Sequence, residues 1–235
     1  GGGGHSLNDC LLPGPKRQAD LVKILGNFRS SRIGLCSDVK RFFLSVRLSS
    51  DKDKDLLRFI HRDKNGEIYV YRFKSLIFGG KDSPFISAMT LKHHLSRMRK
   101  SHPHLVDAID LIERSIYVDD LTSSVDNPRS AITLRQEITE VLGLAWFRIR
   151  KWSSNSPAVL ASVPEEDRAD FKIKQDVPVS EEMRVLGVMW DPESDTLSVP
   201  LPADWENFKT LPVTKRTIAS VTPKIYDPCG FASPY

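Results

Sequence analysis

The sequence has no long hydrophobic run. Its apolar stretches are far shorter than the roughly eighteen consecutive residues that a membrane-spanning helix needs, so we expect no membrane segment. The first ten residues, "GGGGHSLNDC", contain neither the basic stretch nor the apolar stretch of a secretory signal peptide. We therefore expect a protein that is not secreted and that stays inside the cell, in the cytoplasm.

Cysteine is scarce. The three cysteines, Cys10, Cys36 and Cys229, are odd in number, far apart in the chain and outside any Cys-x-x-Cys arrangement. This pattern argues against the disulfide framework of a small secreted domain and against a thiolate zinc site. We predict buried or free thiols.

The chain also lacks a large excess of charge, internal repeats and the regular strand–helix alternation of a doubly wound sheet. Its 235 residues are 40% hydrophobic and 27% charged, which is enough to bury a core. The net charge of +4 permits an anionic partner without requiring one. Helical and strand-like segments are intermixed, so the sequence predicts an α+β fold.

Hydrophobic spacing predicts the main elements. We expect helices over residues 19–29, 84–100, 103–115 and 127–143, and strands ending at Asp38 and within 145–152. Residues 56–73 should form an antiparallel hairpin that turns at Asn65-Gly66. Residues 183–199 read as strand, turn, strand, with Asp191-Pro192 opening the turn.

The predicted helix from Pro84 to Lys100 is unusual because it contains four Lys or Arg residues and no acidic residue. Ser83 is the expected N-cap of this helix and Pro84 its first residue. Two interpretations stay open: a solvated basic face, or a face that contacts nucleic acid.

The stretch "SIYVDDLTSSV" places Asp119 and Asp120 at the centre of a β-branched run. If its two halves pair as a hairpin, both carboxylates lie at the bend, exposed and close together. Two neighbouring anions repel one another unless a cation lies between them, and hard oxygen ligands favour Mg²⁺ or Mn²⁺. The alternative is an ordinary acidic hairpin tip.

Asp38 ends an apolar strand and is followed by "VKRFFL". A two-metal phosphoryl displacement needs carboxylates from separate strands that converge on one site. Asp38 and Asp119 could meet this need from adjacent strands. The alternative for Asp38 alone is a helix N-cap.

The motifs occur in an order that resembles a known family. "SDVKRFF", "FGGKDSP" and "YVDD" are similar to the A, B and C motifs of a reverse-transcriptase palm. "HSLNDCLLPGPK", "DKDLLRFI", "KWSSN", "VLGVMWD" and "KRTIASVTPKIYDPCGFASP" resemble the polyprotein polymerase of BEL/Pao-type long-terminal-repeat retrotransposons. The resemblance implies a palm with partial fingers, in which an antiparallel sheet is flanked by helices. Residues 1–185 would be interleaved fingers and palm, and residues 186–235 a primer-grip-like hairpin and the start of a thumb or connection.

The resemblance also implies an activity, RNA-directed DNA polymerisation. Asp38, Asp119 and Asp120 would be the catalytic carboxylates, and with the carbonyl of Val39 they would bind two Mg²⁺ or Mn²⁺ ions. The substrates would be an RNA or DNA template-primer and deoxynucleoside triphosphates. RNase H and integrase, the rest of the polyprotein, would lie outside this chain.

Further roles follow from the same resemblance. Phe43 would be the steric gate that excludes a ribose 2′-hydroxyl, although a core position is the alternative, and Phe42 is expected in the core. The other nucleotide-binding residues would be Phe78, Gly79 and Tyr117. The nucleic-acid-binding residues would be Ser83, Pro84, Lys92, Arg97, Leu186 and Gly187. Trp190 belongs to the same primer-grip segment, where packing is an equally good explanation.

Some features depart from the family pattern. Phe78 stands where related polymerases often carry Gln, and the fingers strand expected before "HSLND" is missing. We therefore expect a fragment of a polyprotein. A non-catalytic remnant that binds nucleic acid is the second hypothesis. A metal-dependent phosphohydrolase is weaker, because it explains the aspartates but neither Phe43 nor the order of the motifs.

Overall fold

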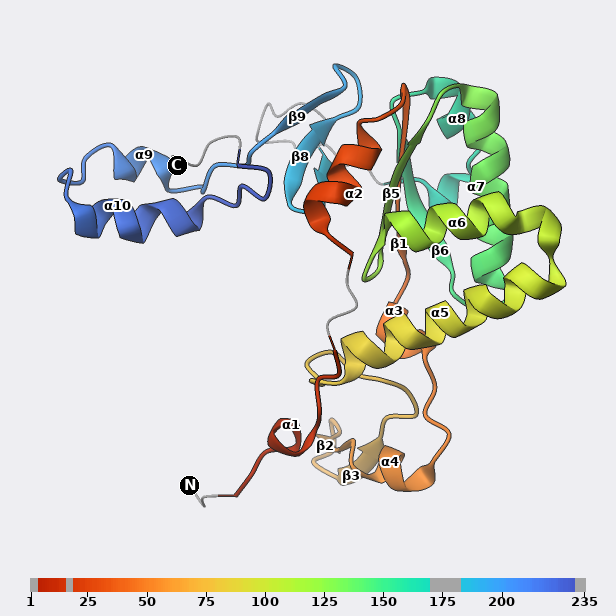
Figure 1. Cartoon of the computed structure of the whole chain (residues 1–235). Helices are drawn as coiled ribbons and strands as arrows, with labels where there is room; N and C mark the ends of the chain where they lie inside the picture. The colour runs from red at the N-terminus through yellow and green to blue at the C-terminus, as the bar shows by residue number, and fades with distance from the viewer. Residues whose placement is uncertain (1–3, 16–18, 170–182, 231–235) are drawn as a thin grey trace. The chain divides into compact units, whose positions relative to one another are not determined.

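The computed structural model describes residues 4–15, 19–169 and 183–230 (Figure 1). The chain forms two compact units, each built from segments that are separated in sequence. We call the first the hairpin unit; it comprises residues 1–18, 39–114 and 136–149. We call the second the sheet unit; it comprises residues 19–38, 115–135 and 150–235.

A four-stranded sheet with the order β4-β5-β1-β6 lies at the centre of the sheet unit (Figure 1). The strands are β4 (Ile116–Tyr117), β5 (Asp120–Val125), β1 (Ile33–Val39) and β6 (Ile149–Ser154). β5 pairs antiparallel with both β1 and β4. The central strands are rich in apolar and β-branched residues, as expected for strands covered on both faces.

The two faces of this sheet are covered by different elements. On one face Leu35 packs with Ala131 of α7 (Pro128–Gly143) and Val159 of α8 (Pro157–Ala161). On the other face Cys36 packs with α2 (Leu21–Phe28) and with β7 and β8. Successive strand residues point to opposite faces, so Asp38 shares the face of Cys36.

A second, three-stranded sheet has the order β7-β8-β9. Its strands are Met183–Val185, Val188–Asp191 and Thr196–Ser198. Trp190 in β8 is 0% exposed, and its ring meets Phe28 of α2 edge-on with centroids 4.9 Å apart. Asp195 accepts a hydrogen bond from the Trp190 indole at 3.1 Å and pairs with Arg29 at 2.6 Å. Packing therefore accounts for Trp190.

Gly34 of β1 permits this packing. A Cβ atom at Gly34 would lie 2.9 Å from the Phe28 ring and 3.0 Å from the Trp190 ring. The distance to Phe28 is shorter than real Cβ contacts, and the distance to Trp190 is at the tight end of them, so at least the Phe28 ring would have to move. The packing of β1, the strand that carries Asp38, thus requires glycine at position 34, four residues before Asp38.

The hairpin unit contains β2 (Arg58–Arg62) and β3 (Ile68–Arg72), which form the predicted antiparallel hairpin. Its turn contains Gly66, with φ 87°. The helices of this unit are α1 (Leu7–Cys10), α3 (Phe42–Ser45), α4 (Asp51–Asp55), α5 (Ser83–Ser101) and most of α6 (Val106–Ser115), with the short η1 (Pro103–Leu105) before α6. The sheet unit adds η2 (Glu165–Asp167), α9 (Trp205–Phe208), α10 (Lys215–Val221) and η3 (Thr222–Lys224).

The predicted α+β class is confirmed, because helices flank an antiparallel sheet. The three cysteines are free thiols, as predicted. Among the described residues, no helix is long and apolar enough to cross a membrane. The predicted domain boundary between residues 185 and 186 falls at the end of β7.

Two predictions about secondary structure were wrong, one about the start of a helix and one about the number of strands in a segment. The N-cap of α5 is Asp82 rather than Ser83, so the helix begins one residue earlier than expected. The segment 183–199 contains three strands rather than two, because Leu186 and Gly187 form an additional tight turn with φ 52° and 93°. Gly187 tolerates positive φ, whereas Leu186 rarely adopts it, so the residue types did not predict this turn.

The packing around Gly34 predicts opposite effects for two Gly→Ala substitutions. Gly34→Ala should lower the free energy of unfolding by about 1–3 kcal/mol, because the methyl group collides with two buried rings. Gly26→Ala, in the exposed part of α2 with open space around it, should raise it by about 0.5–1 kcal/mol through helix propensity. Denaturant unfolding of both variants measures the difference, and equal effects would contradict the packing described.

Candidate active site

Strand register places two carboxylates directly opposite each other. Asp38 of β1 is the cross-strand partner of Asp120 of β5. Side chains of directly opposed residues lie on the same face of a sheet, about 5 Å apart at Cβ, and like charges there are destabilising. Two adjacent strands therefore bring together carboxylates that are 82 positions apart in the sequence.

The third carboxylate comes from the turn between β4 and β5. Tyr117 pairs with Asp120, so Val118 and Asp119 are the two central residues of a tight hairpin. Val118 has φ 57°, a conformation that costs a β-branched residue free energy. The prediction that both aspartates occupy the bend was partly wrong: Asp119 lies at the bend, whereas Asp120 is the first residue of β5, and both are half-buried rather than exposed.

Burial and mutual repulsion raise the pKa values of the hairpin carboxylates. The pKa of Asp120 rises to about 6, first because burial disfavours the charged form and then because Asp119 and Asp38 repel it. Burial and the charge of Asp38 also raise the pKa of Asp119. The site therefore holds more negative charge than its surroundings stabilise, as a cation-binding site does before it binds its ion.

Two neighbouring cations of β6 approach Asp38. Lys151 Nζ lies 3.3 Å from Asp38 Oδ2, and Arg150 Nε lies 3.7 Å from Asp38 Oδ1. Lys151 has φ 53°, which is unusual for a residue in a strand. The motif "KWSSN" contributed only to the resemblance, and no role was predicted for Lys151. Two adjacent basic residues near the start of a predicted strand are the sequence signal that could have identified Arg150 and Lys151.

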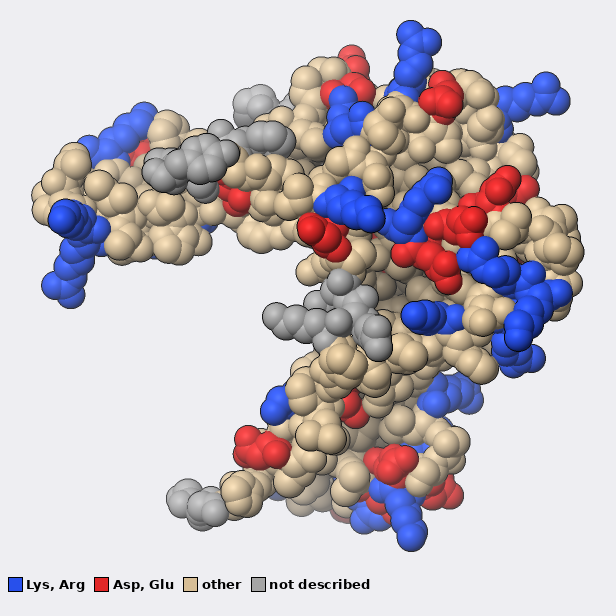
Figure 2. Space-filling model, in the orientation of Figure 1, with Lys and Arg blue, Asp and Glu red and all other residues tan. Residues whose placement is uncertain are grey.

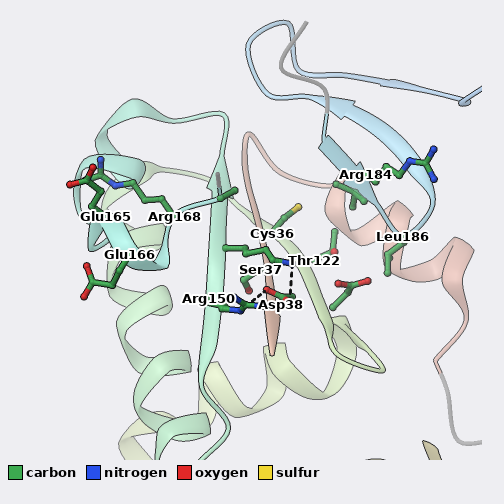
Figure 3. Close-up of a pocket in the computed structure, with 14 residues that line it drawn as sticks. Cys36, Ser37, Asp38, Thr122, Arg150, Glu165, Glu166, Arg168, Arg184 and Leu186 are labelled. Carbon is green, nitrogen blue, oxygen red and sulfur yellow. Dashed lines mark hydrogen bonds and ion pairs between the residues drawn. The ribbon is translucent and has the colours of Figure 1, made fainter. Parts of the chain in front are cut away.

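A pocket of about 530 Å³ lies over the carboxylates of Asp38 and Asp120 within the sheet unit (Figure 3). Cys36, Asp38 and Thr122 form part of its floor, and Asp120 also lines it. Figure 3 shows Ser37 and Arg150 beside Asp38, Arg184 and Leu186 on one side of this floor, and Glu165, Glu166 and Arg168 on the other. Burial raises the pKa of the Cys36 thiol, so this floor residue stays neutral. Of the predicted nucleic-acid-binding residues, Leu186 lines the pocket.

The donor chemistry of the site fits a hard divalent cation. Asp38 Oδ1 is buried and makes no hydrogen bond among the described residues, so this carboxylate oxygen has an unused acceptor position. As the side chains stand, no three His, Cys, Asp or Glu groups in residues 4–15, 19–169 and 183–230 are placed to hold one metal ion. The other oxygen of Asp38 is instead engaged by Lys151.

The hairpin unit holds a second group of predicted residues. The rings of Phe43 and Phe78 meet edge-on with centroids 5.3 Å apart, and Phe78 is 65% exposed. Phe43 is half-buried, whereas Phe42 is 3% exposed, as its predicted core position requires. Gly79 has φ 83°, and its carbonyl accepts a hydrogen bond from Asn8.

The remaining predicted residues are on α5, β1 and the sheet unit. Ser83 is buried at the start of α5, where Pro84 follows it. Lys92 and Arg97 are exposed, and Figure 2 shows basic side chains gathered over the C-terminal half of α5. Arg99 is instead paired with Asp110 at 2.6 Å and Glu113 at 2.9 Å, so the helix is less basic than its sequence suggested.

Three predicted residues lie elsewhere. The Val39 side chain is buried at the end of β1. Tyr117 packs against the buried cluster that α2 forms with β7 and β8, and Gly187 completes the turn with Leu186.

No family model matches the chain, and no curated protein sequence matches it. Solved structures are similar to it at low identity, among them three of foamy viral protease-reverse transcriptases. A prototype foamy virus protease-reverse transcriptase, a selenomethionine-labelled CSH mutant, has 18% identity and a TM-score of 0.42, covering 61% of this chain and 17% of that one. A foamy viral protease-reverse transcriptase dRH in complex with double-stranded DNA has 16% identity and a TM-score of 0.49, covering 90% and 30%. The foamy viral enzyme in complex with an RNA/DNA hybrid has 13% identity and a TM-score of 0.46, covering 88% and 23%. The chain thus spans less than a third of the length of each.

The raised pKa of Asp120 predicts a pH-dependent stability in metal-free protein. A carboxyl with a pKa of about 6 in the folded state and about 4 in the unfolded state binds its proton more tightly when folded. Its contribution is therefore complete below pH ~4 and is lost as the pH rises through ~6. Allowing for solvent screening, Asp120→Asn should be more stable than wild type by about 1–2 kcal/mol at pH 7.5 and nearly equal to it at pH 4.

Denaturant unfolding in EDTA at several pH values measures this effect. The matched control is Asp126→Asn, an exposed aspartate just after β5, which should follow wild type. A stability difference for Asp120→Asn that does not change between pH 4 and 7.5 would contradict the repulsion described.

Proposed function

We propose that this chain is the palm and partial fingers of an RNA-directed DNA polymerase from a BEL/Pao-type long-terminal-repeat retrotransposon. The carrying observation is the position of Asp38 opposite Asp120, with Asp119 at the adjoining turn. The order of the "SDVKRFF", "FGGKDSP" and "YVDD" motifs supports the same proposal. The reaction is transfer of a nucleotide from a deoxynucleoside triphosphate to a primer 3′-hydroxyl.

In this proposal Asp38, Asp119, Asp120 and the carbonyl of Val39 hold Mg²⁺ or Mn²⁺. Two such ions would supply acidity to the primer hydroxyl and neutralise the triphosphate charge. The protein's own contribution is to fix Asp38 and Asp120 on one sheet face, with Asp119 at the adjoining turn. Burial of Asp119 and Asp120 strengthens their attraction for a cation, because water screens the interaction less.

Nucleotide selection would fall to Phe43, Phe78, Gly79 and Tyr117. The ring of Phe43 is braced by Phe78, which limits the positions available to it, as a gate against a 2′-hydroxyl requires. Gly79 gives the loop before α5 a conformation that other residues rarely adopt, and leaves its surface free of a side chain. The Phe43–Phe78 contact and the conformation of Gly79 support a nucleotide-facing surface in the hairpin unit, whereas Tyr117 belongs to the sheet unit.

Grip on template and primer would come from the exposed cations of α5 and from the β7–β8 turn. Lys92 and Arg97 can contact phosphates without reading sequence, which suits a polymerase that copies any template. Ser83 and Pro84 would lie at the template side of the loop. Leu186 and Gly187 form a tight turn against which the Tyr226 ring packs, and this turn would contact the primer strand.

We further propose that the chain is one part of a polyprotein, with RNase H and integrase outside it. Residues 1–185 would form the fingers and palm, and residues 186–235 would carry the primer-grip-like hairpin and begin the thumb or connection. A second candidate function is nucleic-acid binding by a non-catalytic remnant. The exposed Lys92 and Arg97 favour it, because these residues serve binding without any of the aspartates.

Primer extension tests the polymerase directly. With an RNA template, deoxynucleotides and Mg²⁺ or Mn²⁺, wild type should extend the primer, and Asp119→Asn should lose activity by about 100-fold or more because one cation-binding carboxylate is gone. Asp126→Asn is the matched control and should retain activity. Undiminished extension by Asp119→Asn would contradict the assigned site. Absence of extension by wild type, with template-primer still bound, would favour the non-catalytic alternative.

Nucleic-acid binding should depend on the basic face of α5. The double variant Lys92→Gln and Arg97→Gln should bind template-primer more weakly, and the slope of log affinity against log salt should become shallower by about 0.9 for each lost phosphate contact. Lys209→Gln is the control, because its ammonium already pairs with Glu206 at 2.8 Å. Fluorescence anisotropy at several salt concentrations gives the slope. Equal slopes for the double variant and wild type would remove α5 from the binding surface.

A further inference from the structure

Arg150 and Lys151 are neighbours in a strand, yet both approach the same carboxylate. Neighbouring strand residues ordinarily point to opposite faces of a sheet. Here Lys151 leaves the extended conformation, with φ 53°, and its ammonium comes within 3.3 Å of Asp38 while Arg150 lies 3.7 Å from the other oxygen. A conformation that costs a non-glycine residue free energy thus turns a second positive charge onto the acidic face.

Lys151 lies within the carboxylate cluster. Its ammonium is 3.3 Å from Asp38, and Asp38 is the cross-strand partner of Asp120. No acidic side chain other than Asp38 pairs with Lys151 among the described residues. Its ammonium is therefore placed where the acidic cluster needs a cation.

We propose that Lys151 is a built-in counter-ion of the carboxylate cluster, one that holds Asp38 in the metal-free protein and must withdraw before a divalent cation binds. This inference rests on the proposed function, because it takes the three aspartates to be the metal site. It assigns Lys151 a positioning role, since it acts on the metal through Asp38.

The exposure of the two partners suits an exchange of this kind. The side chain of Asp38 is 19% exposed, whereas that of Lys151 is 54% exposed. Lysine is a flexible point charge that water receives readily, so Lys151 can leave the cluster at small cost. The Arg150 side chain is less exposed, at 35%, and its Nε is buried. Departure of Lys151 would free Asp38 Oδ2 beside Oδ1, which accepts no hydrogen bond and has only the 3.7 Å ion pair with Arg150.

The proposal explains why the carboxylates do not form a ready metal site as they stand. A divalent cation has to compete with the ammonium for Asp38. A partly exposed ion pair contributes up to about 1 kcal/mol, so removing the competitor should tighten metal binding by about fivefold. Loss of one positive charge near the carboxylates also strengthens the binding of a divalent cation.

The test compares Mn²⁺ binding to the full 235-residue chain and its Lys151→Met variant, with free Mn²⁺ measured by electron paramagnetic resonance. We expect the variant to bind Mn²⁺ about fivefold more tightly and to have a lower melting temperature than wild type in EDTA. Lys151→Arg, which keeps the charge, should bind within about twofold of wild type. Lys64→Met is the control for net charge, since Lys64 is exposed in the β2–β3 turn region.

The outcomes separate this inference from the proposed function. Equal or weaker Mn²⁺ binding by a folded Lys151→Met variant, with clear binding by wild type, would overturn the counter-ion role and leave the metal site standing. An equal gain in Mn²⁺ affinity for Lys64→Met would show that the gain comes from net charge alone, and this result would also overturn the counter-ion role of Lys151. Absence of Mn²⁺ binding by both wild type and Lys151→Met would overturn the metal site itself, and this inference with it.

Discussion

Repulsion between Asp38 and Asp120 is the constraint on which the rest of the site depends. The register of β1 with β5 fixes the two carboxylates on one face, and neither strand can move them apart without losing its hydrogen bonds. Burial first, and then repulsion by Asp119 and Asp38, makes Asp120 hold its proton to a higher pH, and Lys151 lies beside Asp38 with a backbone angle that non-glycine residues rarely adopt. The sheet supplies rigidity, and the buried cluster around Trp190 and Phe28 keeps its strand in place.

Much of this arrangement was predictable because it depends on patterns that sequence records well. The apolar run before Asp38 predicted β1, and helical spacing of apolar residues predicted α2 and α7, each of which buries apolar residues. The order of the motifs along the chain also pointed to the three aspartates. These features are local, or they follow from which face of an element is apolar.

The parts that escaped prediction share one physical cause. Val118, Lys151 and Leu186 all have positive φ, although their side chains disfavour it. Such conformations are imposed by tertiary packing, so residue preference gives no sign of them. As a result the split of the Asp119-Asp120 pair between turn and strand, the approach of Lys151 to Asp38 and the turn between β7 and β8 became visible only in three dimensions. The pairing of Arg99 with α6 was hidden for a similar reason, because its partners belong to another helix.

The strict alternation of β1 also limits how a gene encoding this chain can change. Leu35 faces the layer formed by α7 and α8, whereas Cys36 and Asp38 line the pocket on the other side of the sheet. Inserting or deleting one codon between Gly34 and Asp38 would exchange the two sides, turning a carboxylate towards the apolar layer beneath α7. The length of this strand is therefore more tightly constrained than the identity of most of its side chains, Gly34 and Asp38 excepted.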